Sequence, residues 1–341
     1  MLKNKKVDMH VHSIFSLGGT KEKPHATETV EQILERAEDT GIGIISITDH
    51  ETTMPYQYIL EHPNVLSKFS GEIVPAVEVS SSYNGIITHI MLYGFKLKDS
   101  RIIDSLPSLI KARNSTSVEK HKEHTEELKR ICDKLGLSYD QDFTATMLGQ
   151  SGHDSFCNHI LSRKENITRV DENGIGHIEG AYQDAEGKQK IFSFSNIREF
   201  YYENLIDKEN PWFIDFSKDI ATLQEVYAEV KQVDPNIIVS LNHIGIYPLK
   251  QSYLSFIEEI RPYIDGIETM HWGHTAVIEE ECNKAATETG LYTFGGSDFH
   301  NPKDHELGKC DNGAREVNSS RLRLPENLYT IHGTKGETQK L

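Results

Sequence analysis

Several short apolar runs in this sequence end in histidine or a carboxylate, and this pattern constrains the fold more than any other feature. The run VDMHVH alternates strictly, so a strand there would place Asp8, His10 and His12 on one face. The run IISITDH is apolar until it ends in Asp49 and His50. In barrel enzymes, polar groups at the carboxyl ends of buried strands form the active site, so both runs predict site residues.

The same arrangement returns further along the chain. Glu78 is embedded in the apolar run IVPAVEVSS, and an unpaired carboxylate buried there would cost several kcal/mol, so a cation partner is expected. Later runs contribute His89, His243, Asp298 and His300. A single histidine of this kind is ordinarily a polar residue without a ligand role, whereas the joint set of His, Glu and Asp suits zinc, manganese or iron. The pattern therefore predicts a metal centre.

Apolar runs alternate with helical periodicity along much of the chain. Thr27 is the expected N-cap of a first helix that ends at Gly41, and Gly290 is expected to end the last one. Other helical stretches lie near residues 102–136, 219–233, 250–260 and 275–289. Strands are expected at about residues 7–12, 44–48, 73–79, 88–94, 237–242, 266–270 and 291–296. This alternation predicts an α/β fold with a parallel sheet or barrel.

The chain divides into three parts on this basis. Residues 1–98 and 237–320 would form the barrel, and residues 99–236 show no strong strand and predict a mainly helical insertion that caps the barrel. Within the insertion, the aromatic-rich residues 191–216 would either shape a substrate pocket or hold the cap together. Residues 321–341 are expected to be a tail with little packing role.

Composition limits the partners. The chain has 36 Lys and Arg against 52 Asp and Glu, and a net charge of -16 disfavours long nucleic acids and anionic membranes. No apolar stretch is long enough to span a bilayer or to act as an N-terminal signal, so a cytoplasmic protein is expected. The four cysteines form no CxxC motif and predict neither a disulfide framework nor a zinc knuckle. The oligomeric state cannot be predicted.

Four motifs, in order, resemble those of the polymerase and histidinol phosphatase (PHP) family of metal-dependent phosphoesterases: VDMHVHS, SITDH, the stretch from Glu78 to His89, and GGSDFH. The resemblance covers roughly residues 1–98 and 237–310. It implies a distorted barrel of seven strands and seven helices with two or three divalent ions at the carboxyl ends of the strands. Zinc, manganese or iron would serve.

The resemblance also implies a ligand set. Glu78 would bridge the first two ions, while His50 and His300 would hold a third. The ligands of the first ion would be His10, His12, Glu78 and Asp298, and those of the second Glu78, His89 and His243.

The chain departs from the family pattern at three places. Leu17 and Gly18 stand where members usually carry an Asp or His ligand of the third ion, so that ion is weakly bound, absent, or completed by another residue such as His25. We interpret His25 preferentially as a loop histidine. Ile244 follows His243 where many relatives have proline, but the ligand is retained. In the insertion, either His153 or His159 would match a histidine that relatives carry in their cap.

The predicted activity is hydrolysis of a phosphomonoester or small phosphodiester, such as a nucleotide or short oligonucleotide, by a hydroxide shared between two ions bridged by Glu78. His271 is a candidate proton donor or phosphate ligand, with a plain loop role for His271 and His274 as the equal alternative. Arg113 is a candidate phosphate clamp, since a guanidinium binds two oxygens at once. Asp8 and Asp49 are expected to orient ligand imidazoles.

Two alternatives stay open. An amidohydrolase-like barrel that cleaves C–N bonds would share the HxH motif, but such barrels usually use a lysine as the bridge, and Glu78 fills that role here. An inactive PHP domain that serves as a binding module would normally have lost ligands, whereas eight remain in this chain.

Overall fold

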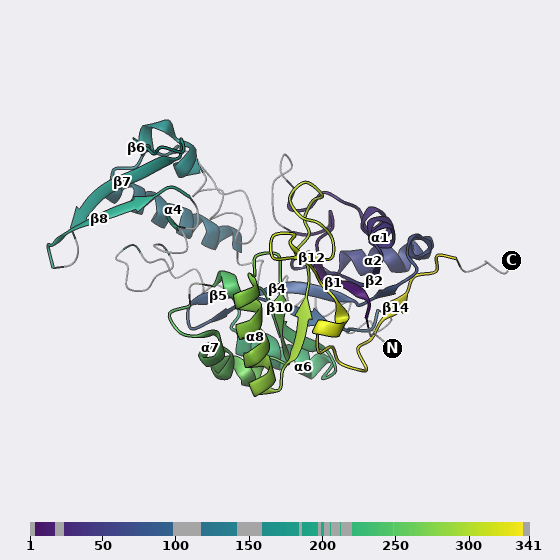
Figure 1. The fold of residues 1–341 in the computed structure, drawn as a ribbon. Coiled ribbons are helices and arrows are strands. Elements are labelled where there is room, and N and C mark those ends of the chain that lie inside the picture. Colours follow the sequence, from purple (N-terminus) through teal and green to yellow (C-terminus); the bar gives the residue numbers. More distant parts are fainter. Residues whose placement is uncertain are drawn as a thin grey trace. The chain divides into compact units, whose positions relative to one another are not determined.

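The computed structural model describes residues 4–17, 24–97, 117–141, 159–183, 186–196, 199–200, 205, 212, 220–247 and 249–336 (Figure 1). The chain forms two compact units. The larger unit comprises Met1–Tyr83, Ile87–Ala112 and Ala221–Leu341, and the smaller one comprises Asn84–Ile86 and Arg113–Ile220.

Seven strands of the larger unit confirm the seven that the sequence predicts. They are β1 (Lys6–Val11), β2 (Ile42–Ile47), β4 (Ala76–Tyr83), β5 (Ile86–Tyr93), β9 (Ile238–Leu241), β10 (Gly266–Met270) and β11 (Tyr292–Gly295). Two-residue strands add to these, namely β3 (Glu72–Ile73), β12 (Lys309–Cys310), β13 (Arg315–Glu316) and β14 (Ile331–His332).

The strands lie in two main sheets, ordered β1-β2-β3-β14 and β11-β10-β9-β5-β4, so the mixed α/β class is confirmed. Parallel pairs join β1 to β2 and β9 to β10 to β11, whereas β5 runs antiparallel to β9. Single parallel bridges join Val11 to Phe299 and His50 to Glu78, at or just beyond the carboxyl ends of β1 and β2. The closed seven-stranded barrel stays a prediction.

The helices of the larger unit follow the predicted periodicity. Helix α1 (Val30–Asp39) is capped by Thr29, not by the expected Thr27, because the Thr29 hydroxyl and the Gln32 side chain form a reciprocal capping box. Helix α8 (Ala276–Thr289) ends at Gly290 in a left-handed conformation with φ of 74°, as expected. The other helices are α2 (Met54–Glu61), α6 (Leu223–Val233), α7 (Tyr253–Ile260) and the 3-10 turns η1 (Pro63–Lys68), η5 (Ile244–Ile246), η6 (Arg261–Tyr263) and η7 (Ser319–Arg321).

One core supports both sheets. The rings of Tyr93 and Phe294 stack at 4.4 Å, and the Tyr93 hydroxyl donates to the Met9 carbonyl at 2.8 Å. The buried cluster around them comprises Val7, Met9, Ile44, Val74, Ala76, Met91, Tyr93, Met270, Phe294, Cys310 and Val317. Because β1, β10 and β11 are anchored in this cluster, the residues at their carboxyl ends are held on a rigid base.

The C-terminal residues pack more closely than the sequence predicts. Strand β14 pairs antiparallel with β3, and the Thr293 backbone N–H donates to the Arg323 carbonyl at 3.1 Å. Leu322, Leu324 and Leu328 pack against the core. The expectation of a loosely packed tail is therefore wrong for the described residues up to 336, since apolar side chains spaced between polar ones still reach the sheet.

The smaller unit contains helix α4 (Ser117–Leu135), the turn η2 (Lys164–Asn166) and strands β6 (Arg169–Val170), β7 (Gly176–Gln183) and β8 (Gln189–Phe194). The strands form an antiparallel sheet, so the prediction of a mainly helical insertion is wrong in this stretch. Most side chains of β7 and β8 are exposed or half-buried, which explains the polar sequence that hid these strands. Helix α6, expected in the insertion, belongs to the larger unit.

The described aromatic residues of the insertion pack on one another. Phe192 and Trp212 lie 5.3 Å apart, and Phe194 stacks on Phe200 at 4.5 Å. All four side chains are buried, which confirms the interpretation that these aromatics hold their own unit together.

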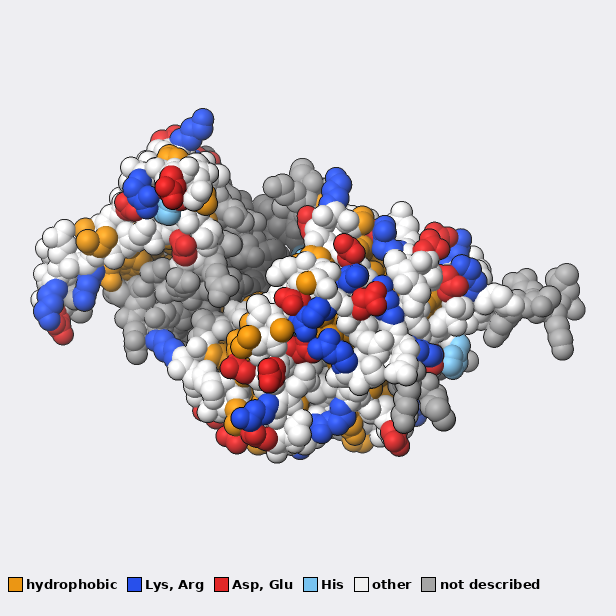
Figure 2. All heavy atoms as spheres, in the orientation of Figure 1, with side chains coloured by type: hydrophobic (Ala, Val, Ile, Leu, Met, Phe, Trp, Pro, Cys, Tyr) orange, Lys and Arg blue, Asp and Glu red, His pale blue; other side chains and the backbone are white. Residues whose placement is uncertain are grey.

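Acidic and basic side chains of the described residues are interspersed on the face drawn in Figure 2. None of the helices in the described part of the chain combines the length and apolarity that a membrane-crossing segment needs. Cys132, Cys282 and Cys310 are buried free thiols.

Candidate metal centre

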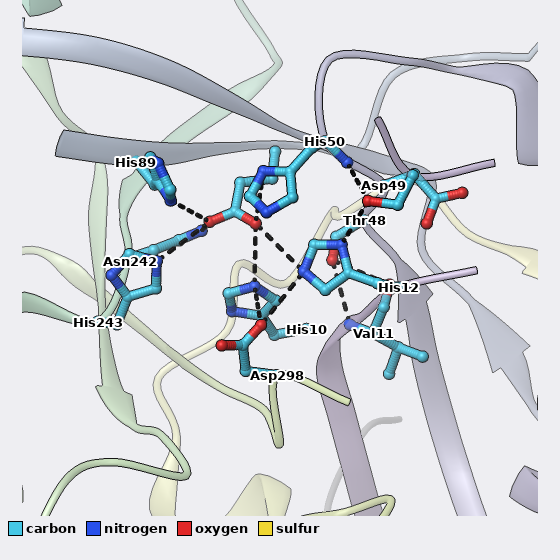
Figure 3. Close-up of polar contacts among 12 residues, drawn as sticks. His10, Val11, His12, Thr48, Asp49, His50, His89, Asn242, His243 and Asp298 are labelled. Atoms are coloured by element: carbon cyan, nitrogen blue, oxygen red, sulfur yellow. Dashed lines mark hydrogen bonds and ion pairs between the residues drawn. The ribbon is translucent and has the colours of Figure 1, made fainter. Parts of the chain in front are cut away.

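Five imidazoles, carried by four strands or by the residues that follow them, surround Glu78. Figure 3 labels these residues as His10, His12, His50, His89 and His243. The Oε2 atom of Glu78 lies 3.2 Å from His10 Nε2, 3.3 Å from His12 Nε2 and 3.4 Å from His50 Nδ1. Strand β1 carries His10 and leads directly to His12, and His50 lies three residues beyond the end of β2. The parallel neighbours β1 and β2 thus bring these rings together at one edge.

The second oxygen of Glu78 faces the other sheet. Its Oε1 atom lies 3.4 Å from His89 Nδ1 and 3.2 Å from His243 Nε2, and it accepts a hydrogen bond from Asn242 Nδ2 at 2.9 Å. His89 lies on β5, and Asn242 and His243 directly follow β9. Five imidazole nitrogens therefore lie within 3.4 Å of one fully buried carboxylate.

Asp298 forms a second carboxylate beside Glu78. Its Oδ1 atom lies 3.2 Å from both His10 Nε2 and His12 Nε2. Its Oδ2 atom lies 3.4 Å from His271 Nε2. His10, His12 and Asp298 together form a group whose ligand atoms lie within 4.8 Å of one another. The ligands implied for the first ion, His10, His12, Glu78 and Asp298, are thus brought together.

A set of donors with this chemistry fits divalent metal ions. His12 Nε2 and His243 Nδ1 are buried, and neither makes a hydrogen bond in the described structure, although His12 Nε2 lies 3.3 Å from Glu78 and 3.2 Å from Asp298. A buried nitrogen without a hydrogen bond is costly, and metal coordination would satisfy it. One carboxylate cannot accept hydrogen bonds from five imidazoles in good geometry. Metal ions shared between the imidazoles and the carboxylate therefore explain their convergence better than hydrogen bonds do.

A third group consists of imidazoles alone. His12, His25, His50 and His300 offer nitrogens within 4.8 Å of one another. The ring of His25 lies 4.8 Å from that of His50 and 4.3 Å from that of His300. His25 thus lies on a loop, as expected, but the loop places its ring among the possible ligands of the third ion, and its role as a ligand stays a prediction. The backbone explains its position, because Thr27 N–H donates to the His300 carbonyl at 3.1 Å and holds this segment beside the loop after β11.

The two sides of the centre differ in protonation. Burial disfavours charge on His10 and His12, but Glu78 and Asp298 outweigh it, so the pKa of His10 is raised well above its usual value and that of His12 is raised to about 9. Burial and then neighbouring imidazoles lower the pKa of His25 to about 3. His50 and His300 follow the same direction, the pKa of His300 falling to about 4 because burial outweighs Asp298.

Burial likewise disfavours ionisation of Glu78, yet its pKa is held well below its usual range by His50, His10 and His12. The carboxylate is therefore ionised and available to bridge cations.

Glu268 is a functional residue that sequence reasoning missed. It is buried on β10, where Oε1 accepts from His10 Nδ1 at 3.0 Å and Oε2 accepts from the His243 backbone N–H at 2.8 Å. Carboxylates in this position fix the tautomer and orientation of a ligand imidazole. The signal was available, since Glu268 interrupts the apolar run of β10 in the way that Glu78 interrupts β4. Asn242, also missed, carried no comparable signal.

Backbone strain marks the strand ends. Glu51, His243 and Asp298 adopt left-handed φ of 55°, 27° and 53°, which side chains other than glycine rarely do. Such conformations cluster at functional sites because surrounding contacts must hold them. Gly296 permits the approach to β1, since a Cβ atom there would lie 2.4 Å from His10 Cβ.

Asp8 and Asp49 do not bond to imidazoles, contrary to expectation. Asp8 accepts from the Ser297 N–H at 2.9 Å, from its hydroxyl at 2.6 Å and from the Gly308 N–H at 2.6 Å. Asp49 accepts from the backbone N–H and hydroxyl of Ser13. Both carboxylates therefore order the loops that carry ligands, and burial raises their pKa values to about 6 and about 7.

His271 lies at the candidate metal centre, where its ring faces Asp298, a predicted metal ligand. Its Nδ1 atom accepts the Gly273 N–H at 3.0 Å, which leaves the proton on Nε2 opposite Asp298. His274 uses both nitrogens structurally, donating from Nδ1 to the Thr269 carbonyl at 3.1 Å and accepting the Gly245 N–H at 3.0 Å. The structural interpretation is thus confirmed for His274, while the proton-donor role of His271 stays a prediction.

The remaining predicted residues either lie outside the described part of the chain or are placed elsewhere than among the possible ligands. Arg113, Gly18 and His153 lie outside the described residues. His159 belongs to the smaller unit, where its Nε2 atom accepts the Asp140 N–H at 3.1 Å. Leu17 is 44% exposed, and its N–H donates to the His50 carbonyl at 3.3 Å, so this position borders the imidazole group.

No family model matches the chain. The proteins to which it is similar include a curated relative and two solved structures. The relative, phosphoribosyl 1,2-cyclic phosphate 1,2-diphosphodiesterase from Eggerthella lenta, is 23% identical over 295 residues, which cover 86% of this chain and 93% of the relative.

An amidohydrolase from Chromobacterium violaceum aligns with a TM-score of 0.60 and 16% identity over 98% of this chain and all of its own. A protein from Bifidobacterium adolescentis, described as a "putative metal-dependent phosphoesterase", aligns with a TM-score of 0.50 and 18% identity over 92% and 96% of the two chains. At these identities the two structures show a shared fold.

Proposed function

We propose that this protein is a hydrolase that cleaves phosphate ester bonds with divalent metal ions held around Glu78. One observation carries the proposal: five imidazole nitrogens and the carboxylate of Asp298 converge on a buried, ionised glutamate. The curated relative, a phosphodiesterase by name, and the neighbour described as a metal-dependent phosphoesterase support the same reaction class.

The residues divide the work by position. Glu78 would bridge two ions through its two oxygens, with His10, His12 and Asp298 on one side and His89 and His243 on the other. When bound, zinc, manganese or iron ions would neutralise phosphoryl oxygens and lower the pKa of a water molecule. Glu268 holds the His10 ring so that its Nε2 atom faces Glu78, and Asn242 fixes Glu78 Oε1. The Nε2–H group of His271 donates a hydrogen bond to Asp298 Oδ2.

A third ion would be held by histidines alone. His25 supplies the ligand that Leu17 and Gly18 do not, and it completes a group with His50 and His300. An ion held by this group would add positive charge that no carboxylate of the group offsets. This charge favours the binding of an anionic substrate next to it.

The proposed substrate is a phosphomonoester or a small phosphodiester, with a nucleotide, a short oligonucleotide or a cyclic phosphate as candidates. The cyclic phosphate in the relative's name supports the diester arm. A net charge of -16 disfavours the binding of long polyanions. Bound metal ions would dominate the electrostatic field at short range, so a small phosphate ester could still bind. We further expect a cytoplasmic protein.

Amide hydrolysis is the second candidate, because the amidohydrolase neighbour shares the fold with a TM-score of 0.60. The groups that contact Glu78 in the described structure are histidines and an asparagine, with no lysine among them. The bridge is thus a carboxylate, which favours the phosphate reaction.

A substrate panel tests the proposal. Protein stripped of metal and reconstituted with Zn, Mn or Fe is assayed on nitrophenyl phosphate, bis-nitrophenyl phosphate, cyclic phosphates and several amides, with Glu78→Ala as the matched inactive control. Metal-dependent phosphate release is expected. Turnover of amides while every phosphate stays intact would overturn the proposal in favour of the second candidate.

A further inference from the structure

Asp298 is held by an unusual pair of hydrogen bonds at its backbone carbonyl. Both His300 Nδ1, at 2.7 Å, and His305 Nδ1 donate to this one oxygen. The residue needs such support, because its φ of 53° is left-handed and its side chain must still face His10 and His12.

His305 is itself held in place. Its ring packs against Trp272 with centroids 4.7 Å apart and planes 32° apart, and its backbone N–H donates to the Asn301 carbonyl at 3.2 Å. Trp272 follows β10, and its carbonyl accepts the Asn312 N–H at 2.7 Å. The ring of His305 is therefore fixed between the end of β10 and the loop after β11.

The tautomer follows from the partner. A carbonyl oxygen only accepts hydrogen bonds, so the proton of His305 must lie on Nδ1. The other donor to this oxygen, His300, belongs to the group of possible metal ligands, whereas His305 does not. Of these two histidines, only His305 combines the hydrogen bond to the Asp298 carbonyl with no place in the groups of possible metal ligands.

We propose that His305, backed by Trp272, is a positioning residue that holds the left-handed backbone of Asp298 and thereby aims its carboxylate at the ion shared with His10 and His12. The inference rests on the proposed function in that Asp298 binds a metal. Without the His305 donor, the Asp298 carbonyl keeps one hydrogen bond instead of two, and the peptide after Asp298 is held only by His300 and by its own N–H, which donates to the His10 carbonyl at 3.4 Å. The carboxylate would then leave its position 3.2 Å from the two Nε2 atoms.

Two substitutions separate this role from simple packing. His305→Leu keeps an apolar side chain against Trp272 but removes the donor, while His305→Asn keeps an N–H donor near the position of Nδ1. The readouts are Co²⁺ affinity and the visible absorption spectrum of the Co²⁺-loaded full-length protein, with folding checked by thermal unfolding.

His62→Leu is the matched control. The His62 ring also stacks on an aromatic side chain, that of Tyr58, at 4.3 Å, and its Nδ1 atom donates to the Tyr58 carbonyl at 3.1 Å. It lies on the exposed end of α2, in none of the groups of possible metal ligands. It therefore reproduces the chemistry of His305 without the proposed effect.

We expect His305→Leu to weaken Co²⁺ binding about 10- to 100-fold and to change the spectrum, as other supporting residues of metal sites do, while His305→Asn and His62→Leu keep both. A folded His305→Leu protein with the wild-type affinity and spectrum would overturn the inference. If His305→Leu fails to fold, His305→Asn decides, because weak Co²⁺ binding by that folded variant would contradict the role of the donor. A wild type that binds Co²⁺ but hydrolyses no phosphate would overturn the proposed function alone.

Discussion

The two sides of the candidate centre differ in the groups that would bind metal ions. Around Glu78 and Asp298, carboxylates face His10 and His12 and raise the pKa values of both imidazoles. Around His25, the possible metal ligands are all imidazoles, and burial together with these neighbours keeps His25 neutral, with a pKa lowered to about 3. The first side carries its own negative charge and the second does not, so ions on the two sides should differ in affinity and in metal preference.

Removing the bridge should have the largest effect. We expect Glu78→Ala to lose bound metal and activity together, with activity falling by more than about 100-fold, since even residues that only support ligands cost 10- to 100-fold. Elemental analysis of the purified variant, beside the phosphate assay, measures both losses. Full activity in a preparation shown to be metal-free would contradict a metal mechanism altogether.

Glu268→Gln should cost less, about 10- to 100-fold in activity or metal affinity, because the variant keeps the shape but loses the charge that holds His10 and His243. Titration of the metal-stripped variant measures the affinity. Glu280→Gln, at an exposed position on α8, is the control. Equal affinities in the two variants would mean that Glu268 is only a packing residue.

His25→Ala should reduce the bound metal by about one ion per chain and leave the carboxylate side loaded. His25 belongs to none of the possible ligand groups that contain a carboxylate, although His12 and His50 are shared with those groups. Leu17→Asp tests the same group from its border. In the wild-type background we expect little change, because His25 already completes the group, whereas in the His25→Ala background it should restore occupancy, with a shift towards manganese. A rise in occupancy for Leu17→Asp alone would show that His25 is not a ligand.

Arg113→Ala should have the smallest effect. If Arg113 clamps the substrate phosphate, the variant keeps its metal content and raises KM or lowers kcat several-fold, because only a hydrogen-bonding cation is lost. Steady-state kinetics beside elemental analysis measure this. Unchanged kinetics would mean that Arg113 does not bind the substrate phosphate.

Strand-end polar residues made much of this centre predictable. His10, His12 and Asp298 belong to one group, and Glu78, His50 and His89 to another. The parallel strands β1 and β2 end at one edge, which accounts for His12 and His50, whereas Glu78 and His89 lie within β4 and β5. Glu268 could have been found by the reasoning applied to Glu78. Asn242 could not, because an asparagine after a strand is equally common in a turn.

His25 and His305 lie beyond what sequence reasoning could reach. Each sits on a loop, and no periodicity links it to the strands it meets. Their positions depend on contacts between loops, which include the hydrogen bonds from the Thr27 N–H to the His300 carbonyl and from His305 to the Asp298 carbonyl. The sheet in the smaller unit was missed for another reason, since its exposed strands lack the apolar alternation that marks a half-buried strand.

In the larger unit, the order of the seven longer strands and of most helices, the α/β class and the candidate metal ligands on strands were determined by the sequence alone, because burial imposes a period on the side chains of regular elements. The tertiary structure alone decided which histidines meet, how Glu268 and His305 support them, and that the C-terminal residues pack on the sheet. Those contacts join residues far apart in the chain through loops, and loops carry no period from which their partners can be inferred.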